Sequence, residues 1–236
     1  MKKLFMLAAM FMMGITATSA QEIRDMFGTD QKGDIGYGVR VGLNISNING
    51  EYGPGPDGKL DLNARAGFQF GGVVDLPITN GFYIQPGLSF TTRGARQKQT
   101  IREAKLVNSF RPMYLQIPVL ASFRADVCDK LNVQVNVGPH FAMGLGGKSV
   151  TKYSAAGESS TGKIPFFGKS SGDEEHFGAQ RFDCGLTFGA GVTFMKHYYV
   201  GIAYDLGLVN MAIDEELGKE TKLHNRNFSI QIGYNF

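Results

Sequence analysis

The chain has 236 residues, of which 43% are hydrophobic and 19% charged, so it fits one domain or at most two and is not a disordered chain. Glycine accounts for 32 residues, about twice the usual share of roughly 7%, but the Gly-X-Y repeat of collagen is absent. The formal net charge of +3 is too small to favour nucleic acid as a partner, and two cysteines exclude a disulfide-rich framework.

The N-terminus has the pattern of a secretory signal peptide. Lys2 and Lys3 precede an uncharged run over residues 4–13, and small residues follow up to Ala20. We therefore predict a signal peptide over residues 1–20, with cleavage before Gln21. The rest of the chain contains no run of about 18 apolar residues, which excludes a helical membrane protein.

Segments of alternating apolar and polar residues recur along the mature chain, separated by stretches rich in Gly, Pro, Asn, Asp and Ser. This period of two predicts β-strands, each long enough to cross a membrane at a tilt. The eight predicted strands cover residues 35–45, 64–76, 82–92, 112–123, 131–146, 181–195, 198–208 and 226–236.

The polar face of these strands distinguishes a membrane barrel from a soluble sandwich or lipocalin-like barrel. In residues 131–146 the apolar face carries Val133, Val135 and Val137, whereas the other face carries Asn132 and Gln134. A water-facing sheet normally carries many Lys and Glu, but these polar faces are mostly Gly, Asn, Gln and Ser. They fit a crowded polar lumen with the apolar face turned to lipid.

The predicted connections alternate in length along the chain. Residues 46–63, 93–111, 147–180 and 209–225 form long connections, and residues 77–81, 124–130 and 196–197 form short ones. Outer-membrane barrels have such short periplasmic turns and long external loops. We therefore predict an all-β fold, an eight-stranded antiparallel up-and-down transmembrane β-barrel over residues 35–236, after a short periplasmic segment over residues 21–34.

Aromatic residues lie near the predicted strand ends on the apolar face, as in the interfacial girdles of such barrels. Toward the short turns these residues are Phe82, Phe123, Phe194, Tyr198, Tyr234 and Phe236, and toward the long loops they are Phe68, Phe90 and Phe182. A final strand with Tyr234 and a terminal Phe236 is similar to the assembly signal of outer-membrane barrels. It implies the barrel-assembly machinery as a partner during biogenesis.

Four segments, in this order, resemble a known family: Tyr-Leu-Gln-Ile-Pro-Val-Leu at 114–120, Val-Gly-Pro-His-Phe at 137–141 followed by residues 144–147, residues 182–192 and residues 199–208. The family comprises the small PorT-like or "porin family" outer-membrane barrels of Bacteroidota, related in architecture to OmpA-like and OmpX-like barrels. The resemblance implies an eight-stranded barrel in the outer membrane. The protein that gives the family its name is linked to type IX protein secretion, and the resemblance supplies no catalytic motif.

An eight-stranded barrel leaves an interior that side chains fill, so we predict no open diffusion pore. Charged residues on the inward faces are expected to form a luminal polar network of ion pairs, since an unpaired charge there is costly. Its predicted members are Arg40, Arg65, Asp75, Arg181, Asp183 and Asp205.

A lipid-modifying enzyme with a Ser/His/acid site at the rim is the less favoured alternative. His140 faces inward with Ser89 and Ser122, but no Gly-x-Ser-x-Gly turn supports a nucleophile. The other histidines lie in turns or loops without the spacing of metal ligands. We therefore predict neither catalysis, nor a cofactor, nor a metal.

The long connections are the expected working surface, because loops on a rigid scaffold carry recognition. Residues 93–111 hold six cations and one acid, whereas residues 209–225 are acidic around Asp214–Glu216. We predict that the basic residues contact lipopolysaccharide or an acidic partner; in the alternative, the two loops pair with each other. The predicted contacts are Arg93, Arg96, Lys98, Arg102 and Arg111.

These patterns together predict a non-enzymatic outer-membrane scaffold whose external loops serve adhesion, envelope stability or partner binding. The alternative is an accessory barrel of a secretion system. Two local expectations accompany this prediction. Pro86, Pro118 and Pro139 predict β-bulges, because proline lacks the ladder donor. Cys128 and Cys184 are expected to lie too far apart for a disulfide.

Overall fold

The computed structural model describes residues 35–51, 62–79, 81–101, 104–155, 158–170, 175–213 and 221–236. The predicted signal peptide and the segment over residues 21–34 lie outside these ranges. No helix in the described ranges is long and apolar enough to cross a membrane. The strands are β1 Gly36–Glu51, β2 Asn63–Thr79, β3 Phe82–Thr92, β4 Ala95–Ile101, β5 Ala104–Cys128, β6 Leu131–Ala155, β7 Glu158–Pro165, β8 Phe182–Phe194, β9 Tyr198–Gly207 and β10 Lys222–Asn235.

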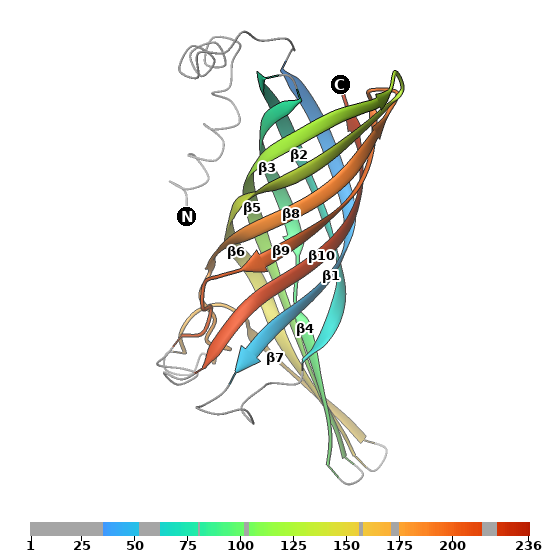
Figure 1. Ribbon diagram of the computed structural model, residues 1–236. Helices are drawn as coiled ribbons and strands as arrows, with labels where there is room; N and C mark the ends of the chain where they lie inside the picture. Colours follow the sequence, from blue (N-terminus) through green and yellow to red (C-terminus); the bar gives the residue numbers. More distant parts are fainter. Residues whose placement is uncertain are drawn as a thin grey trace.

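Eight of the strands close into an antiparallel barrel (Figure 1). The ring runs β1–β2–β3–β5–β6–β8–β9–β10 and returns to β1 through the β1–β10 pairing. This confirms the predicted eight-stranded up-and-down fold. The short connections β2–β3, β5–β6 and β8–β9 share one end with the C-terminus, which we call the turn end. The opposite end, with the longer connections, is the loop end.

The alternation in the sequence becomes two faces of the barrel wall. On β1, Leu43 is 72% exposed on the outside, while Asn44 is 1% exposed in the lumen. On β6, Val135 points outward and Gln134 is buried inside in the same way. Apolar side chains therefore cover the outer surface and polar side chains fill the interior, as expected of a barrel in lipid.

The three prolines do not produce the predicted bulges. Pro86 lies opposite Val119, and Pro139 lies opposite Leu186, each within a continuous register. The register also continues past Pro118. A proline removes one ladder hydrogen bond but adds no residue, so the inward and outward faces keep their alternation. The register shifts occur instead at 77/79, 113/114 and 126/128.

Strands β5 and β6 are 25 residues long and extend beyond the ring at the loop end. There they pair with β4 and β7 to form a four-stranded extension, which we call the projecting sheet: residues 95–101, 104–111, 148–155 and 158–165 (Figure 1). The prediction of loops over 93–111 and 147–180 was therefore wrong for much of both ranges. The segments of the projecting sheet carry polar residues on both faces. The pattern of apolar residues in the sequence therefore did not reveal these strands.

Candidate functional site

Arg93 lies between β3 and β4 and points into the lumen. It is 1% exposed, and its guanidinium pairs with Asp183 Oδ2 at 3.2 Å and Asp205 Oδ2 at 3.0 Å. Its Nη2 also donates to Gln116. The prediction that Arg93 contacts an external ligand was therefore wrong. The residue continues the inward series through Thr91 by the two-residue period of the strand.

Polar side chains complete this cluster, which we call the loop-end ion cluster. Asn225 donates to Asp183 at 2.8 Å and Asn227 donates to Asp205 at 3.1 Å. Thr187 donates to Asp205 at 2.7 Å, and His140 Nδ1 lies 3.0 Å from the Thr187 hydroxyl. Each carboxylate thus has a cationic partner and neutral donors, which is what makes a charge tolerable in a tight lumen.

A second cluster lies nearer the turn end. Arg124 Nη2 lies 2.6 Å from Asp75 Oδ1, and Gln85 donates to the same oxygen at 2.6 Å. Arg40 donates to Asn235 at 2.7 Å, with its guanidinium 4.1 Å from the Tyr199 ring centroid. The inward series of β5 continues to Arg124, although this residue lies in the short connection predicted over residues 124–130.

Only four of the six residues predicted to form the luminal polar network lie buried in the lumen. Asp75, Asp183, Asp205 and Arg40 are buried in the lumen, as the alternation predicted. The two remaining arginines lie elsewhere. Arg65 is half-buried and donates to the Arg93 carbonyl at 3.4 Å, and Arg181 is exposed and donates to the Gly144 carbonyl at 3.0 Å. Among the described residues of the lumen, the cations of the ion pairs are Arg93 and Arg124.

An apolar cap covers the loop-end ion cluster. Tyr114 is fully buried, meets the Phe167 ring edge-on at 5.5 Å and donates to Met211 Sδ at 3.4 Å. The segments that follow β7 and β9 supply five members of the cap: Phe166, Phe167, Ala179, Met211 and Ala212. The cap comprises Ile48, Leu62, Ala95, Phe110, Tyr114, Ala142, Phe166, Phe167, Ala179, Met211, Ala212 and Leu223.

Between the two ion clusters the lumen retains a cavity of about 80 Å³, lined by Arg40, Gln85, Gln116 and Asp205 among others. This volume holds a few water molecules. His140, Thr187 and Asp205 form a chain that resembles a proton relay, but His140 is 0% exposed beneath the cap. Among the described residues, no group of three His, Cys, Asp or Glu side chains is placed to bind a metal.

The projecting sheet has one cationic face. Arg111 lies directly opposite Lys148, Lys98 and Lys152 flank Val107 from either side, and Lys163 lies opposite Val150. Directly opposed residues share a face, so one side of the sheet carries seven exposed cations. They are Arg96, Lys98, Lys105, Arg111, Lys148, Lys152 and Lys163. No carboxylate of the described residues lies within ion-pair distance of these seven.

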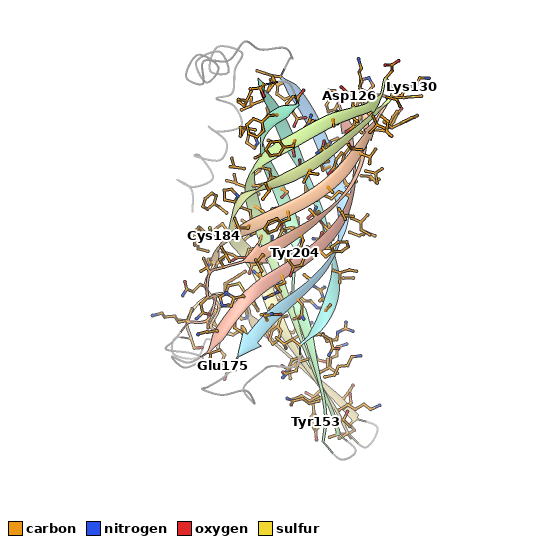
Figure 2. The ribbon with its side chains drawn as sticks, in the orientation of Figure 1. Asp126, Lys130, Tyr153, Glu175, Cys184 and Tyr204 are labelled. Atoms are coloured by element: carbon orange, nitrogen blue, oxygen red, sulfur yellow. The ribbon has the colours of Figure 1, made fainter. Side chains whose placement is uncertain are left out.

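The other face of the same sheet carries no Lys or Arg among its described residues. Its rows contain Gln97 with Asn108 and Thr151, then Gln99 with Leu106 and Tyr153. This face continues the luminal side of β5, and the cationic face continues the lipid-facing side. Figure 2 shows Tyr153 at the far end of the sheet, well beyond the barrel.

A single β-bulge places Lys148 and Lys152 of β6 on the cationic face. Tyr114 lies opposite Gly144, but Met113 lies opposite Gly146, so Leu145 is an extra residue on β6. One inserted residue reverses which side chains point outward beyond it. Without the shift, Lys148 would point away from Arg111 and toward the luminal side.

The structure thus brings together three of the predicted contact residues: Arg96, Lys98 and Arg111. Arg102 and the acidic stretch at 214–216 lie outside the described residues. Sequence reasoning missed Lys148, Lys152 and Lys163, because only strand pairing shows that they share a face with Arg96. A run of glycines at 144 and 146–147 is the one local signal of an irregularity there.

The lipid-facing exterior and filled polar interior define a small transmembrane β-barrel. The family described as "Outer membrane protein beta-barrel domain" matches residues 20–212, so the chain belongs to that family and resides in the outer membrane. No curated protein matches the chain.

Several solved structures are similar to this chain. Ail, the attachment invasion locus protein of Yersinia pestis, shares 15% identity over 86% of this chain and 100% of its own, with a TM-score of 0.41. Neisserial surface protein A shares 10% identity over 85% of this chain and 97% of its own, with a TM-score of 0.41. OprG of Pseudomonas aeruginosa shares 11% identity over 85% and 95%, with a TM-score of 0.42.

Proposed function

We propose that this protein is a non-enzymatic outer-membrane scaffold that binds polyanionic ligands through the cationic face of its projecting sheet. The turn end lies in the periplasm and the loop end lies outside the cell. Binding of lipopolysaccharide or an acidic surface partner would serve envelope stability or adhesion. One observation carries the proposal: seven exposed cations gather on one face, and the described residues of the opposite face carry none.

The arrangement of charge on this face favours an anionic ligand. Like charges directly opposite each other, such as Arg111 and Lys148, destabilise a sheet rather than stabilise it. A phosphate or sulfate group between them turns that repulsion into charge-assisted hydrogen bonds, and the guanidinium fork of Arg96 or Arg111 matches such oxygens. The face is therefore better suited to binding than to folding.

The test is binding of phosphorylated lipopolysaccharide by the purified, detergent-solubilised protein. A variant with Arg96→Gln, Lys98→Gln and Lys152→Gln loses affinity, because three cations leave the face. The matched control substitutes Gln97, Gln99 and Thr151 by Ala on the opposite face and keeps wild-type affinity. Equal affinity for the wild type and the cation variant would contradict the proposal.

The filled lumen supports a barrel that does not serve as a diffusion pore. The cap, the loop-end ion cluster and the Arg124–Asp75 pair occupy successive levels of the interior. Planar-bilayer recordings of the pure protein should give no reproducible large conductance. A stable large channel would show that the cap does not close the lumen.

The resemblance to PorT-like barrels supports an accessory role in protein secretion as the alternative function. Two of the segments that carry it, residues 114–120 and 182–192, supply Tyr114, Gln116, Asp183 and Thr187 to the luminal clusters. Those segments thus account for the interior rather than for a partner surface. Affinity purification from membranes separates the two roles, since secretion subunits would favour the alternative.

A further inference from the structure

A groove of about 370 Å³ lies on the outer surface where the projecting sheet leaves the barrel. It is formed by the loop-end part of β2 and by the stretches of β5 and β6 around the bulge. Three cations line it, Arg65, Arg111 and Lys148, together with the apolar side chains of Phe68 and Met113. The groove therefore combines a basic part with an apolar part.

The apolar part belongs to the lipid-facing surface. Phe68 is 50% exposed and Met113 is 38% exposed, both on outward-facing positions. The Phe68 ring lies 6.0 Å from Phe90, and Phe90 lies 5.3 Å from Phe70, within the aromatic belt of the loop end. Such belts mark the boundary between hydrocarbon and headgroups. The groove thus opens at the depth where a lipid changes from acyl chain to headgroup.

The basic part lies on the other side of that boundary. Arg111 and Lys148 face each other across β5 and β6, and both are exposed. The positive charges of Arg96 and Arg111 both act on the Arg65 guanidinium. No described carboxylate pairs with Arg65, Arg111 or Lys148, so the positive charge of the groove is uncompensated.

The backbone keeps the groove open. Gly147 lines it with φ 155°, a conformation that favours glycine. A side chain at this position would meet the Cα of Pro112 at 2.6 Å. Because Pro112 and Gly147 pair directly across β5 and β6, any larger residue would push the two strands apart at the floor of the groove.

We propose that this groove binds a phosphorylated lipid of the outer leaflet, with the phosphate between Arg111, Lys148 and Arg65 and an acyl chain along Phe68 and Met113. This inference rests on the proposed orientation of the barrel and deepens the proposed polyanion binding. The ligand is a lipid because a soluble polyanion would make no contact with the apolar side chains of the groove. The phosphorylated glycolipid anchor of lipopolysaccharide has the required chemistry.

The test uses the full-length protein purified in detergent, with native mass spectrometry to count bound lipid. The probes are the lipid anchor of lipopolysaccharide with its phosphates and the same anchor after enzymatic dephosphorylation. The double variant Arg111→Gln with Lys148→Gln should bind the phosphorylated anchor about tenfold or more weakly, since charge-assisted hydrogen bonds contribute on this order. Met113→Asp should weaken the same binding through its acyl contact.

The matched control is the double variant Lys98→Gln with Lys152→Gln, which removes the same charge farther along the same face. Its affinity for the isolated anchor should fall much less than that of the Arg111 and Lys148 variant, because neither lysine lines the groove. Heat-dependent gel mobility verifies that each variant retains a folded barrel. Dephosphorylation of the anchor should reduce binding to the level of the Arg111 and Lys148 variant.

Three results would overturn the lipid site. Unchanged binding after Arg111→Gln with Lys148→Gln would contradict binding in the groove. Equal binding of the dephosphorylated anchor would contradict the phosphate contact. Equal losses in the groove variant and in the Lys98 and Lys152 control would overturn the groove but support polyanion binding over the whole face. If neither variant affects binding of complete lipopolysaccharide either, the proposed function fails together with the inference.

Discussion

Arg93 and Arg96 lie three residues apart on one nearly continuous strand line, yet they belong to opposite environments. Arg93 is 1% exposed and contacts two carboxylates, whereas Arg96 is exposed on the cationic face without a described carboxylate partner. Strands β3 and β4 keep one register against β5, with Thr92 opposite Met113 and Arg96 opposite Ser109. Inward or outward position, rather than residue type, therefore decides whether a cation stabilises the fold or remains available to a ligand.

The energetic consequences differ between the two regions in the same way. Removing one partner of a buried ion pair costs about 3–5 kcal/mol, because the other charge is left unpaired in a poor solvent. Substituting an exposed charge that has no such partner usually changes the unfolding free energy by about 0.5 kcal/mol or less. Stability measurements should therefore distinguish the loop-end ion cluster from the cationic face.

The largest effect is expected for Arg93→Met, which leaves Asp183 and Asp205 without their cation. The folded barrel should lose about 3–5 kcal/mol of unfolding free energy. The measurement is the urea midpoint followed by circular dichroism and by heat-dependent gel mobility. A midpoint equal to that of the wild type would contradict the structural role of Arg93.

A compensating variant sharpens this test. Arg93→Met combined with Asp183→Asn and Asp205→Asn removes the cation and both carboxylates together. Because replacing a whole buried ion cluster by neutral groups is often close to neutral, most of the lost stability should return. A triple variant less stable than Arg93→Met alone would show that the ion pairs are not the cause.

The next effect concerns the apolar cap. Phe166→Ala should destabilise the protein by about 3 kcal/mol, since it removes a fully buried ring packed against Phe110, Phe167 and Phe177. Unfolding in urea measures the change. The exposed Phe123→Ala, at the turn end of the lipid-facing surface, is the comparison and should cost less in detergent. Equal losses would contradict a packed cap.

A much smaller effect on stability is expected on the cationic face. Lys98→Gln with Lys152→Gln should change the unfolding free energy by less than about 0.5 kcal/mol, because both side chains are exposed. The urea midpoint of this variant, compared with that of Arg93→Met, checks the contrast. A loss similar to that of Arg93→Met would mean that the face is part of the folded core.

Oxidants are not expected to form an intramolecular disulfide between Cys128 and Cys184. Cys128 lies opposite Leu131, and Cys184 lies opposite Phe141, ten residues farther along β6. Ten residues of strand span roughly 34 Å, and a disulfide needs Cα atoms within about 7 Å. Mass spectrometry of the unreduced protein that detects this bond would contradict the strand order.

The sequence was sufficient to predict the eight strands of the ring, because their outward side chains are apolar and lipid selects that alternation. Leu43, Val135 and Ile202 are exposed as that pattern requires. Two of the predicted strands, however, ended just before a charged residue, at Thr92 and at Phe123. Arg93 and Arg124 were therefore placed in connections, although the period of two continues through both.

The projecting sheet was harder to predict for a physical reason. Outside the lipid its two faces are both polar, so hydrophobicity carries no period there. The bulge at Leu145 also has no pattern of apolar residues to mark it, and it decides on which face Lys148 lies. The cationic face arises from strand register, which a single sequence does not display.

The most direct test of the account is the accessibility of the projecting sheet on living cells. In a background with Cys128→Ser and Cys184→Ser, a single cysteine replaces either Lys98 of the projecting sheet or Asp126 at the turn end, which is labelled in Figure 2. Both positions are exposed. A membrane-impermeant maleimide should label the Lys98→Cys protein on intact cells and the Asp126→Cys protein only after the outer membrane is disrupted. Labelling of Asp126→Cys on intact cells, with Lys98→Cys protected, would contradict it.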